Sequence, residues 1–577
     1  MKIKTIASAL LLTACLCGCS NNDDAGKNDV VKVVLEGVLS TDKARYAPSE
    51  VVTFSLDKTL PVGSKVRYLH LGNVVEEQPV SGKTWTWTPP AADFKGYLVE
   101  VYNDADGTKK TVATTGVDVS STWTRFPRYG FLSEYPAKTS AEINAVMDNL
   151  NKHHINGLQY YDWLYDHHKP LAGTVAAPAA TWLDLIKRTN TRATTEAYLT
   201  SAKNRGMASM WYDLCYGALD NAAADGVQEN WYLFTNSNHT TKDRHTLNSP
   251  FRSSIYLTNP NNEDWLNYFS QQVADVYAVY DFDGFHIDQL GGRNTLYDYS
   301  GNTVNLPAGF TAFINKMKAD FPSKKHAFNA VSGYGQEQIA AAAPDFFYNE
   351  IWGDQDNYAH LKTIIDLNHT YNPALNCVYA AYMNYDKGKQ KGTFNTPGVL
   401  MTDAVIFALG ASHLELGEHM LCSEYFPNSN LTMDKTLQAA LVRYYDFLVA
   451  YENLLRDGGE FNNIAVSGTN LAAWPPKMGS IISLTKSVGT KQVVHLLNFV
   501  SATHMEWRDF KGTQAEPRLQ KNVALQIAST QTVTKVWVAT PDSEGKMYEE
   551  VPFEQNGAGV VTVAVPALKY WTMVVME

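Results

Sequence analysis

Short apolar runs alternate with helical periodicity through the middle of the chain. Eight runs, bounded by glycine, proline or charge, have the length and composition of buried strands in a parallel sheet. They occupy residues 128–132, 156–163, 206–213, 282–288, 325–331, 346–352, 374–381 and 404–415. Helices are predicted between these runs at 140–150 (capped by Ser140), 196–205 and 263–280, and after the last run at 435–455. This alternation predicts a (β/α)8 TIM barrel over residues 121–455.

The segments on either side of the predicted barrel show the period-two alternation of β-strands. The clearest examples are residues 51–56, 65–71, 97–102, 492–498, 522–527, 533–538 and 560–565. We therefore expect a multidomain protein, with an N-terminal immunoglobulin-like β-sandwich over 30–120 and a C-terminal β-sandwich over 456–577. Trp85 and Trp87 fit either a sugar-binding platform or a spacer domain with one core tryptophan, and we favour the spacer.

The first residues have the pattern of an export signal. Lys2 and Lys4 precede an apolar run that is too short to span a membrane as a mature helix. An ordinary cleaved signal is one interpretation of this segment. The other, which we favour, is a lipoprotein signal peptide over residues 1–19.

The cysteines near residue 19 decide between these interpretations. Leu16-Cys-Gly-Cys19 resembles a bacterial lipobox, and Leu12-Thr-Ala-Cys15 fits the pattern loosely. We expect lipidation at Cys19, because a polar tether over residues 20–29 begins there. The acidic residues of this tether favour an outer-membrane lipoprotein exposed on the cell surface over one facing the periplasm. The membrane would then be reached through the lipid anchor alone.

Composition and charge narrow the possible partners. The chain has 577 residues, of which 45% are hydrophobic and 12% aromatic, so it can build sizeable cores and stack sugar rings. Its formal charge of -11 argues against nucleic acid as a partner. Cys215, Cys377 and Cys422 are far apart and lie in or beside apolar segments, which predicts buried free thiols. Nothing in the sequence predicts the oligomeric state.

Asp288 and Glu350 lie at or near the carboxyl ends of two predicted barrel strands. Asp288 follows an apolar run and precedes Gly291-Gly292, and Glu350 follows three aromatic residues. The carboxyl ends of barrel strands carry catalytic groups, and a water-poor setting raises a carboxyl pKa. Asp288 could instead cap a turn and Glu350 could form a structural ion pair. Their joint placement favours the pair of carboxylates that a glycosidase uses.

Polar and aromatic residues at the other strand ends are candidates for binding sugar hydroxyls and ring faces. They are Asp162, Trp163, Trp211, Asp213, His286, Asn329, Trp352, Tyr382, Asn384, His413 and Glu415. For each of them packing is a comparable explanation. The histidine pairs 153–154 and 167–168 raise a metal alternative, but neighbouring residues on a strand point apart and no HExxH spacing occurs. We expect no metal and no cofactor.

At these positions the sequence resembles glycoside hydrolase family 66, which contains endo-dextranases and enzymes that make cyclic isomaltooligosaccharides. The resemblance rests on residues 282–288, 348–352, 400–407, 412–418 and 423–428, and covers the barrel and the order of flanking domains. It implies that Asp288 is the nucleophile and Glu350 the acid/base of a retaining enzyme that acts on α-1,6-glucan.

The resemblance predicts a dextranase that hydrolyses internal bonds of dextran to isomaltooligosaccharides. Cyclising members carry an additional carbohydrate-binding module inside the barrel, and a barrel over 121–455 has no room for one. The alternatives are a transglycosylase that makes cyclic or longer isomaltooligosaccharides, and a non-catalytic α-glucan-binding lipoprotein. Retention predicts carboxyl groups about 5–5.5 Å apart.

Overall fold

The computed structural model describes residues 35 and 37–577. The predicted signal peptide, the tether and Cys19 lie outside these residues. Within the described part of the chain, no helix has both the length and the apolar composition needed to cross a membrane. Cys215, Cys377 and Cys422 are buried free thiols, as predicted.

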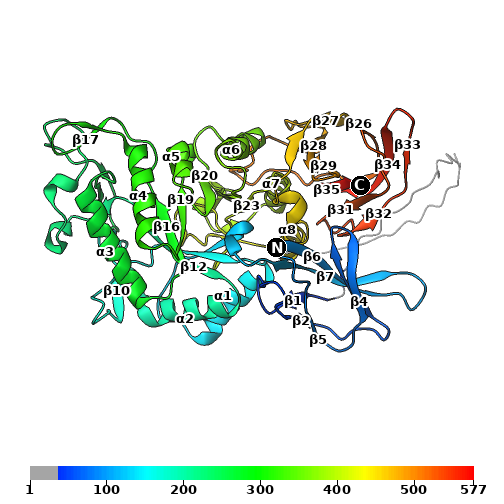
Figure 1. Ribbon diagram of the computed structural model, residues 1–577, viewed down its shortest axis with the longest axis horizontal. Coiled ribbons are helices and arrows are strands. Elements are labelled where there is room, and N and C mark those ends of the chain that lie inside the picture. Colours follow the sequence, from blue (N-terminus) through cyan, green and yellow to red (C-terminus); the bar gives the residue numbers. More distant parts are fainter. Residues whose placement is uncertain (1–34, 36) are drawn as a thin grey trace, which may run out of the picture.

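The centre of the molecule is a barrel of eight parallel strands (Figure 1). The strands are β8 (Tyr129–Leu132), β9 (Gly157–Tyr160), β12 (Ala208–Leu214), β16 (Gly284–Asp288), β19 (Lys325–Asn329), β20 (Phe346–Glu350), β21 (Cys377–Ala380) and β23 (Ser412–His413). They pair in this order, as the alternating pattern predicts. The backbone N–H of Phe131 donates to the carbonyl of Leu416 at 3.1 Å, which brings the last strand back to the first.

Helices cover the outside of the barrel. They are α1 (Ser140–Lys152), α2 (Arg192–Asn204), α3 (Glu263–Val279), α4 (Leu306–Asp320), α5 (Gln336–Ala341), α6 (Tyr358–Tyr371), α7 (Thr396–Ala408), α8 (Lys435–Ala450) and α9 (Glu452–Leu455). The capping residue of α1 is Thr139, not Ser140. Thr139 and Glu142 form a reciprocal capping box, which satisfies two N–H groups at the start of the helix.

The prediction for the last strand was too long. Residues 404–408 belong to α7, and the strand is confined to Ser412–His413. Residues 398–408 are buried all around α7, so the helix shows no amphipathic stripe. A short apolar run of this kind cannot be assigned to helix or strand by periodicity.

Side chains alternate between the inside and the outside of the barrel along each strand. Those inside form one hydrophobic cluster, which includes Met210, Ala327, Phe346 and Val378. Their neighbours in sequence face the helices and join the larger core. This alternation decides which residues can reach the open end of the barrel.

The N-terminal part consists of two antiparallel sheets around a shared core. One contains β1 (Leu39–Thr41), β2 (Val52–Leu56) and β5 (Thr84–Trp87), and the other β3 (Lys65–His70), β4 (Asn73–Pro79), β6 (Lys95–Asn103) and β7 (Lys110–Val119). Trp87 is buried and stacks on Tyr68, and Trp85 stacks on Phe54. Both tryptophans therefore belong to the packing of this domain. Its immunoglobulin-like classification stays a prediction.

The C-terminal part also has two sheets, with an aliphatic core between them. The first contains β25 (Glu460–Asn462), β27 (Leu471–Ala473), β28 (Ile481–Val488), β29 (Lys491–Asn498), β31 (Val536–Ala539), β32 (Glu549–Glu550) and β35 (Trp571–Met576). The second contains β26 (Val466–Gly468), β30 (Gln520–Ala528), β33 (Phe553–Gln555) and β34 (Val560–Leu568).

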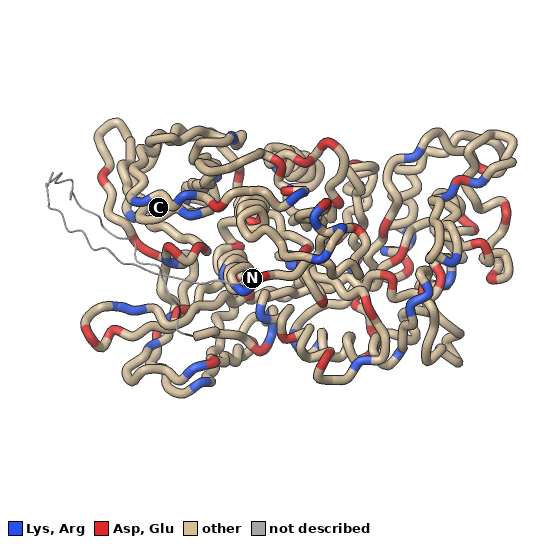
Figure 2. Tube along the Cα trace, turned by 180° about the vertical axis from the view of Figure 1, so that it is seen from behind, with Lys and Arg blue, Asp and Glu red and all other residues tan. Residues whose placement is uncertain are grey.

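Helix α8 connects the barrel with both β-domains, which lie at one end of the elongated molecule (Figure 1). Asp446 of α8 accepts hydrogen bonds from Thr115 and Gly116 of β7, and Tyr444 donates to Asp542 of the C-terminal domain. Acidic and basic residues are interspersed along all three parts (Figure 2). The domains thus form one packed body without a long stretch of a single charge.

Candidate active site

The two predicted carboxylates lie together at the open end of the barrel. Asp288 is the last residue of β16 and Glu350 the last of β20, and both line a cavity of about 600 Å³. Strand β19 lies between these two strands and ends at Asn329, which also lines the cavity. Three neighbouring strand ends therefore place two carboxylates and an amide side by side.

Asn329 bridges the two carboxylates. Its Nδ2 donates to Asp288 Oδ1 at 2.8 Å and to Glu350 Oε2 at 3.0 Å. These two oxygens are therefore at most 5.8 Å apart, the sum of the two bonds. The backbone N–H of Glu350 donates to Asn329 Oδ1 at 3.2 Å, which fixes the amide with its nitrogen toward the carboxylates.

Further donors hold each carboxylate. The hydroxyl of Tyr212 donates to Asp288 Oδ2 at 2.7 Å, and the backbone N–H of Gln289 donates to Asp288 Oδ1 at 2.8 Å. The hydroxyl of Tyr382 donates to Glu350 Oε1 at 2.6 Å. Each carboxylate is thus oriented by one tyrosine and by the shared amide.

Burial, and then the neighbouring Glu350 carboxylate, raise the pKa of Asp288 to about 7. Burial also raises the pKa of Glu350. Two carboxyls this close share one proton near neutral pH, because both cannot ionise cheaply in a water-poor site. Asp288 receives N–H hydrogen bonds from Gln289 and Asn329, and Glu350 receives them from Asn329 and the Trp352 side chain. Each carboxylate therefore has two nitrogen donors.

His286 lies below Asp288 inside the barrel. Burial lowers the pKa of His286 to about 3, so the ring is neutral. It stacks between Tyr129 and Tyr212 and meets the edge of Tyr348. His286 thus supports the ring of Tyr212, which in turn holds Asp288.

Aromatic side chains surround the cavity. Trp352 packs against Tyr382 at 5.2 Å between ring centroids, and Tyr161 stacks on Phe426 at 4.3 Å. All four residues line the cavity. Rings of this kind present faces to the C–H surfaces of sugars.

Asp162 lines the same cavity, just after β9. Its backbone is in the left-handed region, with φ 48°. Residues other than glycine rarely adopt this conformation, and those that do are often found at functional sites. Burial raises the pKa of Asp162 to about 6, and the Arg188 and His167 side chains oppose that shift.

One side of the cavity is apolar. Leu185, Leu247, Phe251 and Ile255 line it, and they pack together in a small cluster. They come from the long connections after β9 and β12, whose short strands are β10 (Thr181–Leu183), β11 (Thr189–Thr191), β13 (Gly217–Ala218), β14 (Arg244–His245) and β15 (Ile255–Leu257). Sequence patterns gave no sign that these connections shape the site.

Five of the predicted substrate-binding residues line the cavity, and they are Asp162, His286, Asn329, Trp352 and Tyr382. The other six, Trp163, Trp211, Asp213, Asn384, His413 and Glu415, are buried away from it, which corrects their predicted placement at the mouth. Trp211 stacks on Phe285 at 3.9 Å on the helix-facing side of the sheet. Trp163 packs against Phe282 on the same outer side.

The remaining four are held by internal polar contacts. Asp213 Oδ1 pairs with Nδ1 of His167, which itself lines the cavity, so Asp213 acts on the site only through that ring. Asn384 donates to the carbonyl of Asp509 at 2.7 Å, and ties the barrel to the segment before β30. His413 and Glu415 lie in the barrel wall, outside the cavity.

Alternation along the strands explains both these corrections and the residues that the sequence analysis missed. On β12, Met210 and Tyr212 face inward, so Trp211 and Asp213 must face outward. Tyr212, Tyr161, Gln159, Tyr348 and His167 all line the cavity, and none was among the predicted site residues. The same rule that selected Asp288 on β16 would have selected Tyr212 on β12.

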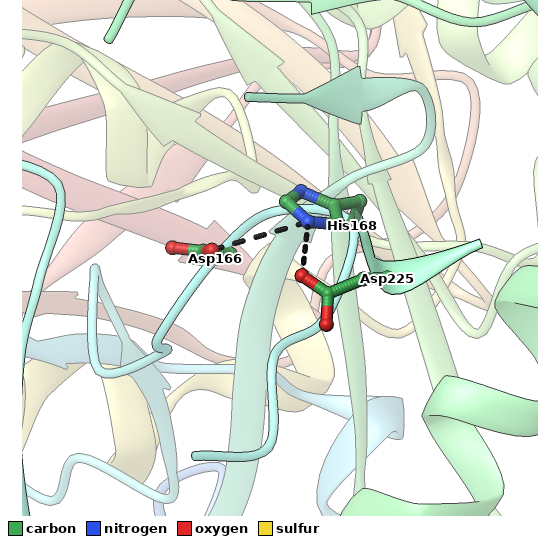
Figure 3. A group of neighbouring side chains, drawn as sticks. All are labelled: Asp166, His168 and Asp225. Carbon is green, nitrogen blue, oxygen red and sulfur yellow. Dashed lines mark hydrogen bonds and ion pairs between the residues drawn. The ribbon is translucent and has the colours of Figure 1, made fainter. Parts of the chain in front are cut away.

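One histidine pair of the metal alternative lies close to the site. His168 lies between Asp166 and Asp225 (Figure 3). Its Nδ1 accepts the backbone N–H of Leu219 at 3.3 Å, so Nε2 carries the ring proton toward Asp225. Arg252 pairs with Asp166, and Lys169 pairs with Asp225 at 2.6 Å.

The Asp166–His168–Asp225 cluster is therefore already neutralised by cationic side chains. No ring nitrogen lone pair is left for a metal ion.

Comparison with known proteins gives consistent matches along almost the whole chain. The model of glycosyl hydrolase family 66 matches residues 41–575. A cycloisomaltooligosaccharide glucanotransferase of Niallia circulans is 27% identical over 706 aligned positions, which cover 93% of this chain and 71% of that protein. A dextranase of Streptococcus salivarius is 24% identical over 555 positions, which cover 84% of this chain and 67% of that protein.

A solved structure shows the same arrangement of domains. It is the crystal structure of a Paenibacillus cycloisomaltooligosaccharide glucanotransferase in complex with cycloisomaltoheptaose. The superposition has a TM-score of 0.84 at 26% sequence identity, and covers 93% of this chain and 99% of that one.

Proposed function

Because the chain belongs to glycosyl hydrolase family 66, we propose that it is a retaining endo-dextranase, with Asp288 as nucleophile and Glu350 as acid/base. The observation that carries the proposal is the Asn329 bridge, which holds the two carboxylates within reach of one glycosidic bond. The substrate class is supported by the names of the relatives, a dextranase and two glucanotransferases that make cyclic isomaltooligosaccharides.

The spacing of the carboxylates supports retention. Their bridged oxygens are at most 5.8 Å apart, the sum of the 2.8 and 3.0 Å bonds. Retaining enzymes have carboxyl groups about 5–5.5 Å apart, whereas inverting enzymes leave about 6.5–9.5 Å for a water molecule. Asp288 is thus close enough to attack the sugar directly.

The reaction would then follow two steps. The Asp288 carboxylate attacks the anomeric carbon while Glu350 gives its proton to the departing glycosidic oxygen, which leaves as the hydroxyl of the shortened glucan. Glu350, now ionised, takes a proton from a water molecule that attacks the anomeric carbon and releases Asp288. Because Asn329 donates hydrogen bonds to both carboxylates, it can stabilise the negative charge on Asp288 in the first step and on Glu350 in the second.

Hydrolysis and cyclisation differ only in the acceptor of the second step. The alignment with the Niallia circulans glucanotransferase runs over 706 positions, 129 more than the 577 residues of this chain (706 minus 577). At least that many residues of the relative have no counterpart here. The shorter chain supports hydrolysis, and transfer to a sugar hydroxyl is the second candidate because the glucanotransferases are the more similar relatives in sequence identity.

The test is product analysis after incubation of the purified protein with linear α-1,6-glucan. We expect a ladder of short linear isomaltooligosaccharides from wild type, and none from Asp288→Asn or Glu350→Gln. Cyclic products would show that the protein is a transglycosylase and not a hydrolase. Binding of the glucan without products from wild type would contradict the enzyme proposal and support a glycan-binding protein.

Rescue by azide distinguishes the roles of the two carboxylates. In Asp288→Gly, azide should enter from the face of the lost nucleophile and give a glycosyl azide of inverted configuration. In Glu350→Ala it should attack the glycosyl-enzyme and give the retained azide. The opposite stereochemistry in the two variants would reverse the assignments.

The proposed location follows from the N-terminal sequence alone. We propose a lipoprotein anchored at Cys19 and exposed on the cell surface. Cys19→Ala should move the protein from the membrane fraction to the soluble fraction. Protease treatment of intact cells should digest the wild-type protein, and resistance to protease would support a periplasm-facing anchor instead.

A further inference from the structure

A second cluster of titratable side chains lies inside the barrel wall, away from the cavity. Asp403 comes from α7, His413 from β23, and Glu415 from the segment that follows β23. All three are buried, with 0%, 1% and 1% of their surface exposed. Their candidate ligand atoms lie within 4.8 Å of one another.

The hydrogen bonds of His413 determine its tautomer. Nε2 lies 2.6 Å from the carbonyl oxygen of Ala381, which can only accept, so Nε2 carries a proton. Nδ1 faces two carboxylates, with Asp403 Oδ1 at 2.8 Å and Glu415 Oε2 at 3.4 Å. A nitrogen lone pair this close to two anionic oxygens requires a positive centre between them, which is either a proton or a metal ion.

Charge balance separates these two possibilities. One proton on Nδ1 makes His413 a cation, and leaves one uncompensated negative charge in a site closed to water. A second proton would have to reside on a carboxyl oxygen. Among the described residues Asp403 Oδ2 has no hydrogen-bond partner, and Glu415 Oε2 has only the 3.4 Å contact with His413 Nδ1, so neither oxygen has a well-formed hydrogen bond that would hold a second proton.

A divalent cation could take one ligand atom from each of the three residues. Two carboxylates and a neutral imidazole balance its charge and supply two oxygens and one nitrogen. Metal-binding histidines typically donate their other N–H to a backbone carbonyl, as His413 does to Ala381. An imidazole ligand favours zinc and its transition-metal neighbours over calcium and magnesium.

We propose that Asp403, His413 and Glu415 bind a divalent transition-metal ion of the zinc class. The proposal does not depend on the proposed enzymatic function. The ion would have a structural role, because the cluster does not line the cavity. Its ligands would join α7, β23 and, through the 2.9 Å bond from Tyr445 to Glu415, helix α8.

The segment after β21 connects the cluster with the carboxylate pair. His413 binds the carbonyl of Ala381, and the next residue, Tyr382, donates to Glu350. An ion at this position would fix the end of β21 and with it the tyrosine that orients Glu350. We therefore expect loss of the ion to lower thermal stability first, and activity through Tyr382.

The chain contains its own control for this proposal. The Asp166–His168–Asp225 cluster also combines one histidine with two carboxylates, but its ring nitrogens and carboxylates already have protein partners. Asp225→Asn should therefore leave the metal content unchanged. Asp403→Asn and Glu415→Gln keep the shape of their side chains and should abolish metal binding.

The experiment measures metal content of the purified full chain by mass spectrometry, after growth with added Zn²⁺ and gel filtration. We expect about one ion per chain in wild type and in Asp225→Asn, and at least a tenfold loss in Asp403→Asn and Glu415→Gln. Growth with Co²⁺ should give visible absorption bands in the same two proteins. This spectrum tests the site in wild type even where a variant fails to fold.

Two results would overturn the proposal. One is wild type that contains no stoichiometric metal and whose melting temperature does not rise when Zn²⁺ is added, which would show that protons hold the cluster. The other is equal loss of metal from Asp225→Asn and Asp403→Asn, which would place the ion elsewhere. Neither result depends on activity toward dextran, so the proposed function is tested separately.

Discussion

The two tyrosine hydroxyls at Asp288 and Glu350 offer a direct test of the roles proposed for these carboxylates. Tyr212 donates to Asp288 at 2.7 Å and Tyr382 donates to Glu350 at 2.6 Å. Replacing either by phenylalanine removes one donor and keeps the ring. Loss of a donor destabilises the ionised carboxylate, so the pKa of its partner rises.

The size of the effect follows from the strength of such bonds. A hydrogen bond to a charged group contributes about 1.5–3 kcal/mol, and one pKa unit corresponds to about 1.4 kcal/mol. Each substitution should therefore raise the pKa of one carboxyl by about 1–2 units.

The sign of the change in activity differs between the two variants. The nucleophile must be ionised, so Tyr212→Phe should move the acidic limb of the kcat/KM profile toward higher pH. The acid must be protonated, so Tyr382→Phe should move the alkaline limb toward higher pH. At a pH below the wild-type acidic limb, Tyr212→Phe should lose about tenfold to a hundredfold in kcat/KM, and recover on the plateau.

The assay is the initial rate of reducing-end release from dextran between pH 4 and 9. Tyr161→Phe is the matched control, because its hydroxyl lies at the same cavity but donates to the Glu424 carbonyl. Its two limbs should stay in place. An interchange of the two shifts would mean that the roles of Asp288 and Glu350 are reversed. If neither limb of the kcat/KM profile moves by more than about 0.3 pH units in either variant, the argument from hydrogen bonding is refuted.

Three further predictions concern stability and binding. Trp211→Ala should lower the free energy of unfolding by about 3–5 kcal/mol, measured by denaturant titration, without changing KM. Trp352→Ala should raise KM about threefold to tenfold with little loss of stability. The reverse pattern would contradict the placement of Trp211 in the core and of Trp352 at the cavity. Arg128→Met removes the guanidinium that pairs with the buried Asp118 and Glu452 carboxylates and should cost about 3–5 kcal/mol. An unchanged melting temperature would show that the remaining side chains compensate these charges. Burial raises the pKa of Glu418 to about 7 from 4.5, so the folded state retains a proton that the unfolded state releases, and stability should fall as pH rises through this interval. Glu418→Gln should flatten that slope, and an unaltered slope would assign it to other groups.

Local patterns in the sequence were enough to predict the barrel. Strand and helix signals depend on residues that are close in sequence, and eight strands that alternate with helices leave few possible folds. The same patterns placed Asp288 and Glu350 at strand ends. They failed for residues 404–408, because a helix buried on all sides has the same apolar composition as a buried strand.

Alternation along a strand is also a local pattern. On β12 it excludes Trp211 and Asp213 from the cavity and selects Tyr212. Contacts between distant segments were not available in the same way. Asn384 binds Asp509, 125 positions further along, and Asp403 meets His413 across a helix and a strand. Their partners could be found only in the folded chain.

The sequence by itself determined the architecture of the barrel and the two strand ends that carry carboxylates, because both depend on local periodicity. The tertiary structure decided which polar groups meet, since hydrogen bonds form between residues that folding brings within 3 Å of one another. Asn329, Tyr212 and Tyr382 acquire their roles only when β12, β16, β19, β20 and the segment after β21 end side by side. The apolar wall of the cavity depends on the folding of two long connections, whose positions no strand or helix pattern encodes.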